Sequence, residues 1–332
     1  MKKVSILVPI YGVEQYIEQC ARSLFSQSYP HCEFIFVDDA SKDGSLARLR
    51  GVAAEYKELE QQIKIVELPQ NGGVATARNA ALDAATGEYI LFVDADDWVD
   101  CQIVERLVLR ALETSSQICN AWCMSVTQSG KRKRTPANWL KGKNAHLKAV
   151  IEQSHIVPNH VRGMLFEREL FERHNLRFTP RVDFGEDYSL LPQLIYHAQG
   201  LATLPEYLYF YRVENQGSYM NNISQRHIAN YIEAQRIVSR FIGSLDDPTT
   251  FSYSLEKGRL NIKKWIFRRG ADPRTYNQQL FDNPNPKIAW PLLRAYNRVI
   301  DSQAAPAIKF MSLVVNFKVL VAALLCGSGG RR

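Results

Sequence analysis

The chain of 332 residues lacks a glycine-rich phosphate loop, shows no internal repeat and contains only six cysteines. Neither G-x-G-x-x-G nor a P-loop follows the first apolar segment, where residues 9–12 read Pro-Ile-Tyr-Gly. Any phosphate groups of a ligand must therefore be held by other means. Cys119 and Cys123 lie close together but lack the second pair that a zinc site requires. We interpret the cysteines as reduced core thiols of a cytosolic protein.

The sequence also lacks the pattern of a signal peptide and a set of membrane-spanning segments. Met1-Lys2-Lys3 and the apolar residues after it are similar to a signal peptide, but Pro9 and Glu14 interrupt the run. No small-residue cleavage site follows, so we expect the first strand of a sheet here.

Composition is that of an ordinary globular protein, with 46% apolar and 23% charged residues. The length suits one large α/β domain, alone or with a smaller appendage. The net charge of +7 is uneven: residues 1–250 carry 27 basic and 30 acidic residues, whereas residues 251–332 carry 14 and 4. The basic excess thus belongs to the C-terminal part.

Strand and helix patterns alternate four times in the first hundred residues. The expected strands are Val4–Ile10, Phe34–Val37, Ile63–Leu68 and Tyr89–Val93. The expected helices cover residues 14–27, a segment after the turn 41–45 that Ser41 or Asp43 caps, and a segment that Asn71-Gly72-Gly73 opens and that runs to about Ala84. This order predicts an α/β fold with a mostly parallel sheet, helices on both faces, and ligands at the carboxyl ends of the strands.

Beyond residue 100 the pattern is looser. We expect helices at 99–114, 167–174 and 187–197, a hairpin at 118–134, and short strands at 203–211 that Pro205 interrupts. The basic run of the hairpin, Lys131–Arg134, is typical of a solvated face; a phosphate or lipid contact is the alternative. From about residue 224 the pattern is helical, so we divide the chain into residues 1–223, with halves 1–100 and 101–223, and residues 224–332.

An apolar run at Tyr89–Val93 ends abruptly in Asp94, Asp96 and Asp97. On an extended strand Asp94 and Asp96 would point the same way. Two convergent carboxylates need a cation between them, and Mg²⁺ or Mn²⁺ suits oxygen ligands. The alternative is that Asp96 or Asp97 caps the next helix and Asp94 is a solvated loop residue.

Polar residues also follow the other strands. Asp38 and Asp39 follow the second strand, and Asn71-Gly72-Gly73 follows the third. Asp39 could accept from the imide N–H of a uracil-type base, and Arg78 could reach the base or the phosphates. Taken singly, the carboxylates are also explained by helix capping and Arg78 by a surface ion pair. Their convergence on one sheet edge favours a binding site.

Four motifs in order resemble glycosyltransferase family 2. They are Val4–Tyr11, Val37-Asp38-Asp39-Ala40-Ser41 with Lys42–Ser45, Asn71–Gly73 with Ala77–Asn79, and Asp94-Ala95-Asp96-Asp97. The resemblance covers about residues 1–100. Further on, Phe184–Asp187 resembles the acceptor-side Glu-Asp motif, and Tyr211-Arg212 with Asn215 and Ser218 resembles the loop over the donor phosphates.

The resemblance implies a GT-A (Rossmann-like) fold, a nucleotide-sugar donor and inversion of the anomeric centre. It implies that Pro9 and Tyr11 line the nucleoside pocket, that Asp39 contacts the base, and that Arg78 contacts the base or a phosphate. It implies that Asp94 meets the ribose or sugar and that Asp96 binds Mn²⁺ or Mg²⁺, with Asp94 beside it. The full donor-binding set is expected at Pro9, Tyr11, Glu14, Asp38, Asp39, Asn71, Gly73, Arg78, Asp94, Ala95 and Arg212.

The resemblance further implies that Asp187 is the general base and Glu186 its support. An inverting transfer needs one base that removes the proton of the attacking hydroxyl. The alternative is that both are first-turn carboxylates that the helix dipole favours.

The expected activity is transfer of a hexose or N-acetylhexosamine from a UDP-sugar to a hydroxyl of a surface glycan or lipid-linked oligosaccharide. No Gln-x-x-Arg-Trp occurs, so addition of single sugars is expected rather than processive synthesis. One rival is a sugar-phosphate nucleotidyltransferase, which should carry a glycine-rich loop after the first strand. The other is a non-catalytic glycan- or membrane-binding protein, which intact Asp94, Asp96 and Asp187 disfavour. No nucleic-acid partner is expected.

The C-terminal segment 307–326 is strongly apolar but contains Lys318 near its middle. A charge there makes spanning a bilayer costly. A helix in the interface fits better, because flanking cations are attracted to anionic lipid by about 1 kcal/mol each. The alternative is a buried helix packed on the catalytic domain or on a second subunit. We therefore expect a cytoplasmic protein, held peripherally at the inner face of the cell membrane.

Overall fold

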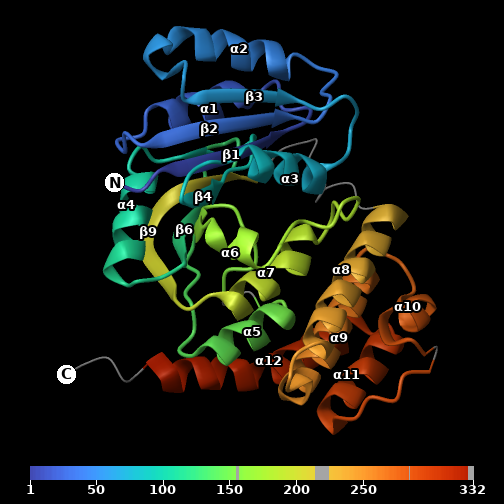
Figure 1. Ribbon diagram of the computed structural model, residues 1–332. Coiled ribbons are helices and arrows are strands. Elements are labelled where there is room, and N and C mark those ends of the chain that lie inside the picture. Colours follow the sequence, from blue (N-terminus) through green and yellow to red (C-terminus); the bar gives the residue numbers. More distant parts are fainter. Residues whose placement is uncertain (155–156, 214–223, 284, 328–332) are drawn as a thin grey trace. The chain divides into compact units, whose positions relative to one another are not determined.

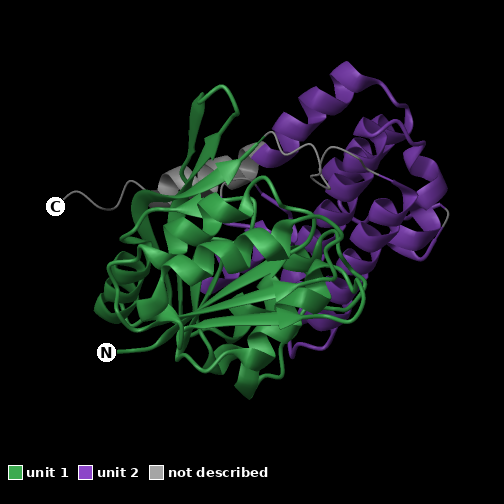
Figure 2. Ribbon diagram, turned by 90° about the horizontal axis from the view of Figure 1, so that it is seen from above, with its two compact units in different colours: residues 1–139, 160–222 green, residues 140–159, 223–332 purple. Residues whose placement is uncertain are grey.

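The computed structural model describes residues 1–154, 157–213, 224–283 and 285–327, with side chains as far as 316. The chain divides into two compact units, coloured differently in Figure 2. The first comprises residues 1–139 with 160–222, and the second residues 140–159 with 223–332.

The first half of the first unit is the predicted alternation of strands and helices (Figure 1). Its strands are β1 (Val4–Ile10), β2 (Cys32–Asp38), β3 (Ile63–Glu67) and β4 (Tyr89–Phe92). They pair in parallel in the order β3-β2-β1-β4. The runs β1, β2 and β4 are buried almost throughout, as expected of strands covered on both faces. The helices are α1 (Ile17–Phe25), α2 (Ser45–Glu55) and α3 (Val74–Ala84).

The second half of the first unit extends the sheet with mixed pairing. The strands are β5 (Trp98–Val99), β6 (Ile118–Val126), β7 (Arg132–Thr135), β8 (Met164–Glu167) and β9 (Leu201–Arg212). β8 lies antiparallel between β4 and β6, whereas β9 runs parallel to β6. β7 pairs antiparallel with β6, which confirms the predicted hairpin. Helices α4 (Ile103–Glu113), α6 (Glu169–Arg173) and α7 (Glu186–His197) complete this unit.

The prediction of broken strand pieces at 203–211 is wrong. β9 is continuous, because the register with β6 shifts between Leu204 and Tyr207 and leaves Pro205 in the irregularity. A proline that cannot donate to the ladder is tolerated in such a bulge. The short strands β5 and β8 were not predicted, since neither carries a clear alternation of its own.

The second unit is helical in its described part. Its helices are α5 (Lys143–Ile151), α8 (Gln225–Gly243), α9 (Ser252–Arg268), α10 (Asn277–Phe281), α11 (Pro291–Asp301) and α12 (Ala305–Gly327). A cluster around Leu260, Tyr296 and Ile300 forms its core. Ile308 and Val315 of α12 belong to this core, whereas Phe310 and Leu313 are 65% and 66% exposed. No helix within the described residues has the length and apolar character needed to cross a membrane.

Residues 140–159 belong to the second unit, although the sequence placed them with the first 223 residues. Buried Glu152, just after α5, explains the difference. Its carboxylate accepts hydrogen bonds from Ser254 Oγ at 2.7 Å and Lys257 Nζ at 2.8 Å, both on α9. Such a long-range buried pair has no local sequence signal.

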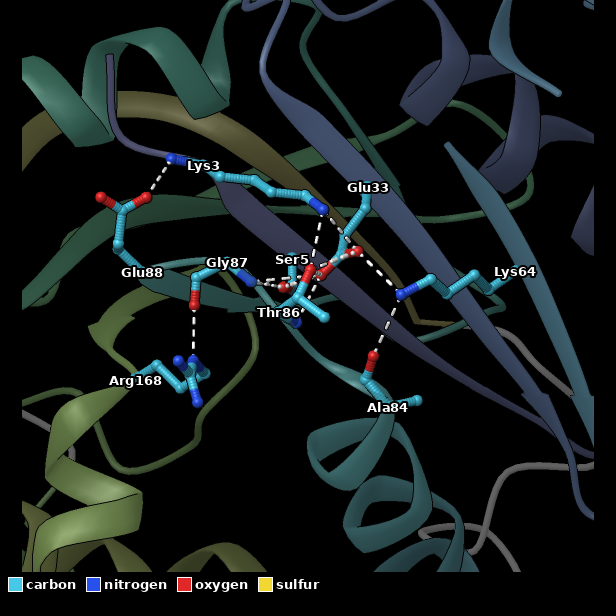
Figure 3. A network of polar contacts seen from close by, with 9 residues as sticks. All are labelled: Lys3, Ser5, Glu33, Lys64, Ala84, Thr86, Gly87, Glu88 and Arg168. Carbon is cyan, nitrogen blue, oxygen red and sulfur yellow. Dashed lines mark hydrogen bonds and ion pairs between the residues drawn. The ribbon is translucent and has the colours of Figure 1, made fainter. Parts of the chain in front are cut away.

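Glu33 joins the amino-terminal ends of the parallel strands (Figure 3). The side chain is 2% exposed and lies on β2. It accepts from Ser5 Oγ on β1, from the Thr86 N–H just before β4 at 2.6 Å, and from Lys64 Nζ on β3 at 3.0 Å. Lys3 Nζ lies 2.9 Å away. Burial raises the pKa of Glu33, but these donors outweigh it and lower the pKa to about 2.

Replacing Glu33 by Gln should lower the free energy of unfolding by about 2 kcal/mol at neutral pH, because two lysines lose their buried partner. The folded-state pKa is depressed from 4.5 to about 2, so the stabilisation is present above pH 4.5 and lost as pH falls towards 2. The difference between wild type and variant should therefore shrink in that range, as urea unfolding at several pH values can measure. Glu67→Gln, at an exposed pair with Arg50, is the control and should cost less than about 1 kcal/mol. An equal loss in both variants would contradict the role of burial.

Candidate functional site

The carboxyl ends of β1, β2, β3 and β4 bring the predicted donor-side residues to one edge of the sheet, as parallel pairing requires. Pro9 pairs with Val37 near the end of β1 and is half-buried. Tyr11 follows it and is 46% exposed. Glu14 accepts from the Gly44 N–H at 2.9 Å, which places it against the start of α2.

Asp39 holds the loop that leads into α3. Its Oδ1 accepts from the Gly72 N–H at 2.7 Å, and its Oδ2 accepts from the Gly73 N–H at 2.8 Å and from Asn71 Nδ2 at 2.9 Å. Burial raises the pKa of Asp39, although the two backbone donors act in the opposite direction. Gly73 has φ +85°, and a Cβ there would lie 1.9 Å from Asp183 Oδ1, so only glycine fits.

Asp38 is also buried, at 4% exposure. Its Oδ2 accepts from the Ser41 N–H at 3.2 Å. Its Oδ1 is buried without a hydrogen-bond partner among the described residues. A buried acceptor in this state is costly, and a ligand donor at this edge would satisfy it.

The acidic segment after β4 is a turn and not a continuation of the strand. β4 ends at Phe92, and the Asp97 N–H donates to the Asp94 carbonyl at 3.0 Å. The prediction that strand alternation aligns Asp94 and Asp96 is therefore wrong, because alternation ends with the strand. The capping alternative is wrong as well: β5 follows, and α4 begins only at Ile103.

Asp97 connects the turn to β9 by hydrogen bonds. It accepts from Tyr209 Oη at 2.8 Å and from the Arg212 N–H at 2.8 Å. Burial raises the pKa of Asp97 well above its usual value, and the charges of Asp96 and Asp94 raise it further. Buried Ala95 lies between the carboxylates and keeps the turn compact.

Arg78 is the centre of the site. Its Nη2 donates to Asp94 Oδ1 at 3.0 Å, and its Nη1 donates to Glu186 Oε1 and Asp187 Oδ1, both at 2.9 Å. The residue is 3% exposed, so the alternative of a surface ion pair is wrong. One guanidinium from α3 therefore joins the turn after β4 to the first turn of α7.

Glu186 and Asp187 share this cation but differ in their other contacts. Burial raises the pKa of Glu186, and the charge of Asp187 raises it further, to about 8, against the effect of Arg78. Burial also raises the pKa of Asp187, while Arg78 and the Val161 N–H, which donates to Asp187 Oδ2 at 3.3 Å, stabilise its charge. Burial therefore favours the protonated form of both carboxyl groups, while Arg78 opposes this effect in each of them.

Arg162 is a site residue that the sequence analysis missed. It precedes β8, and its Nη1 lies 4.0 Å from Asp94 Oδ2. Its guanidinium stacks on the ring of Tyr211 at 4.3 Å. Asp94 is thus flanked by two arginines. No motif marks Arg162, because its position depends on antiparallel β8.

Arg212, at the end of β9, lies beside the acidic turn. Its Nε donates to the Asp96 carbonyl at 2.9 Å, and its guanidinium lies over the rings of Tyr16 and Trp98. Of the predicted phosphate loop, Asn215 and Ser218 lie outside the described residues.

The described residues contain no group of three or more His, Cys, Asp or Glu side chains arranged to hold a metal ion. Nevertheless, Asp96 is a partly exposed carboxylate in the turn after β4. Its oxygens are of the type that Mg²⁺ and Mn²⁺ prefer, and these ions usually complete their coordination with substrate phosphates and water. The donor set therefore fits such an ion.

Comparison with known proteins gives a consistent result. The model of the family described as Glycosyl transferase family 2 matches residues 5–174. The uncharacterised glycosyltransferase EpsJ of Bacillus subtilis is 34% identical over 221 residues, which are 65% of this chain and 62% of that protein. The poly(ribitol-phosphate) beta-glucosyltransferase of Bacillus spizizenii is 30% identical over 222 residues, which are 66% of this chain and 33% of that protein.

The solved structures with similar folds include S. aureus TarS 1-349 in complex with UDP-GlcNAc. That likeness has a TM-score of 0.65 at 19% identity and covers 90% of this chain and 88% of the other. The mannosyltransferase PcManGT from Pyrobaculum calidifontis, in complex with GDP-Man and Mn²⁺, has a TM-score of 0.58 at 20% identity, covering 100% and 88%. At these identities the likeness shows the fold, which is GT-A, as the sequence predicted.

Proposed function

We propose that this chain, which belongs to glycosyl transferase family 2, moves one hexose or N-acetylhexosamine from a UDP-sugar to a glycan hydroxyl. The transfer would invert the configuration of the anomeric carbon. The acceptor would be a growing surface glycan or a lipid-linked oligosaccharide. The observation that carries the proposal is buried Arg78, which joins the donor-side Asp94 to the acceptor-side pair Glu186 and Asp187. Two relatives are named as poly(ribitol-phosphate) glycosyltransferases, which supports a polymeric acceptor.

Neither rival function accounts for this arrangement. A sugar-phosphate nucleotidyltransferase should carry a glycine-rich loop after β1, and residues 9–12 are Pro-Ile-Tyr-Gly. A non-catalytic protein would have no reason to retain three carboxylates around one buried arginine, since burying such charges opposes folding.

For the donor, we assign Pro9, Tyr11 and Asp39 to the nucleoside. The Asp39 carboxylate keeps a lone pair on Oδ1 beside its bond from Gly72, and an imide N–H of uracil can donate to it. Both terminal nitrogens of Arg78 donate to carboxylates, so its contact with the donor would pass through Asp94. Asp94, between Arg78 and Arg162, would accept from a ribose or sugar hydroxyl.

For the metal, we assign Asp96. Asp94 is turned towards two guanidinium groups, which leaves the partly exposed Asp96 as the better ligand of the two. A bound Mn²⁺ or Mg²⁺ would neutralise the diphosphate and the charge that develops on the departing nucleotide.

For the base, we assign Asp187. The acceptor oxygen forms a bond with the anomeric carbon from the face opposite the nucleotide, while the bond from that carbon to the phosphate oxygen breaks and its electron pair leaves with UDP. Asp187 takes the hydroxyl proton. Its raised pKa makes it a stronger base than an exposed carboxylate, and protonated Glu186 adds no competing charge.

For location, we propose peripheral contact with an anionic membrane through α12. Phe310 and Leu313 are one helical turn apart and exposed, and Lys309 beside them is exposed as well. This is the composition of an interfacial helix face. Ile308 and Val315, on the other side of α12, lie in the core of the second unit.

Asp96→Ala should remove the Mn²⁺-dependence of UDP binding and leave the fold intact, because a partly exposed carboxylate is lost without creating a cavity. Isothermal titration with UDP, with and without Mn²⁺, measures this. Asp100→Ala, a partly exposed carboxylate outside the turn, should behave as wild type. Unchanged metal dependence in Asp96→Ala would disprove the assignment.

Asp187→Asn should reduce transfer by roughly 10²–10⁴-fold, the usual contribution of a general base, while UDP binding survives. Glu186→Gln should lose much less, because the amide replaces a group that is already uncharged. Steady-state kinetics and UDP titration separate the two effects, and Glu169→Gln, at an exposed position of α6, is the control. A large loss in Glu186→Gln with a small one in Asp187→Asn would reverse the roles.

Replacing both Phe310 and Leu313 by Ser should release the protein from phosphatidylglycerol vesicles in a flotation assay. The unfolding transition should not change, because both side chains are exposed. The matched control replaces exposed Leu109 and Leu112 of α4 by Ser and should still float. Retention of the first variant on the vesicles would refute the proposed contact.

A further inference from the structure

The hairpin of β6 and β7 carries a concentrated positive charge. Its four consecutive cations, Lys131, Arg132, Lys133 and Arg134, are all exposed. From Thr114 to Trp139 the chain contains these four cations and no acidic residue. We refer to Lys131–Arg134 as the basic strand.

The basic strand lacks the counter-charges found elsewhere on the first unit. Exposed arginines of other elements pair with carboxylates, as Arg22 does with Glu55, Arg106 with Glu206 and Arg173 with Glu169. Within the described part of the chain, no carboxylate forms an ion pair with a cation of the basic strand. These charges are therefore available to a partner.

The sheet register connects the basic strand with the site. Lys133 pairs with Ser125 of β6, and Ser125 pairs with Tyr211 of β9. Register partners share a face, so Lys133 lies on the face of Tyr211, whose ring contacts Arg162 beside Asp94. Two strand spacings, about 10 Å, separate Lys133 from Tyr211.

Aromatic rings lie beside the cations. On the face of the hairpin opposite to Lys133, Arg134 lies over the ring of Tyr207 at 5.4 Å, and Tyr207 packs against Trp122 at 5.1 Å, so both faces of the hairpin carry contacts for a bound chain. Both rings are partly exposed. Flat apolar rings next to free cations suit a chain that alternates apolar sugar faces with anionic groups.

We propose that the hairpin Trp122–Thr135 is a docking arm for an anionic glycan chain, and that it guides this acceptor towards the site along the face of Lys133 and Tyr211. The proposal rests on the proposed function for the identity of the acceptor as a glycan. The anionic groups are carboxylates or phosphodiesters, which the guanidinium and ammonium groups bind alike.

A simpler purpose of lysines on an edge strand is to prevent pairing with another sheet. That purpose explains one or two charges at an edge. It does not explain four consecutive cations, the absence of nearby acids, or an arginine held over an aromatic pair.

The test compares two charge-matched variants of the full chain. The arm variant replaces Lys131, Arg132, Lys133 and Arg134 by Gln. The control variant replaces exposed cations of other elements in the same unit by Gln, namely Arg50, Lys57, Arg106 and Arg173. Binding is measured to polygalacturonate, to poly(glycerol phosphate), to neutral dextran, to single-stranded DNA and to phosphatidylglycerol vesicles, and donor hydrolysis is measured without acceptor.

The arm variant should bind one or both anionic glycans roughly 10- to 100-fold more weakly than wild type, as expected for four lost exposed ion pairs. The control variant should stay within about threefold of wild type, and dextran should not bind. Donor hydrolysis should be the same in all three proteins.

Equal glycan binding by wild type and arm variant, or equal losses in both variants, would overturn the proposal. So would a larger loss for DNA or vesicles than for the glycans. Absence of donor hydrolysis in wild type would refute the proposed function instead, and the binding data would still decide on the arm.

Discussion

The buried guanidinium of Arg78 is the interaction on which the site depends. It binds three carboxylates from two segments that are far apart in sequence: Asp94 after β4, and Glu186 and Asp187 at the start of α7. Taking these charges out of water is unfavourable, and only their mutual hydrogen bonds offset it. Removing the cation would leave mutually repelling carboxylates, so the position of α7 relative to the sheet edge depends on this one side chain.

The same cation contributes to the different environments of the two adjacent carboxyl groups, Glu186 and Asp187. The single positive charge of Arg78 can balance one negative charge in the Glu186–Asp187 pair but not two. Burial raises the pKa of both carboxyl groups. The Val161 N–H adds its stabilisation to Asp187 alone. The two carboxyl groups therefore have different environments before any ligand binds, as the proposed division into base and support requires.

The parallel strands are held at both ends by buried polar contacts. At the carboxyl ends, Asp39 binds the loop before α3, and Asp97 binds Tyr209 and the Arg212 backbone of β9. At the amino-terminal ends, Glu33 joins β1, β2, β3 and the segment before β4. Rigid strands between such contacts position the turn 94–97 against α7, as a site built on a scaffold requires.

The sequence by itself determined the first half of the fold and the donor side of the site. Buried apolar runs and helix periods are local signals, and parallel strands put Asp39, Asn71 and Asp94 at one edge whatever else the chain does. Only the tertiary structure decided the rest. Three contacts are examples: Arg78 faces carboxylates, Arg162 flanks Asp94, and Glu152 binds α9 of the second unit. In each of them the paired residues are about 15 to 110 positions apart in the chain. No local pattern records such contacts, because their free energy comes from burial and charge compensation that exist only once the segments have met.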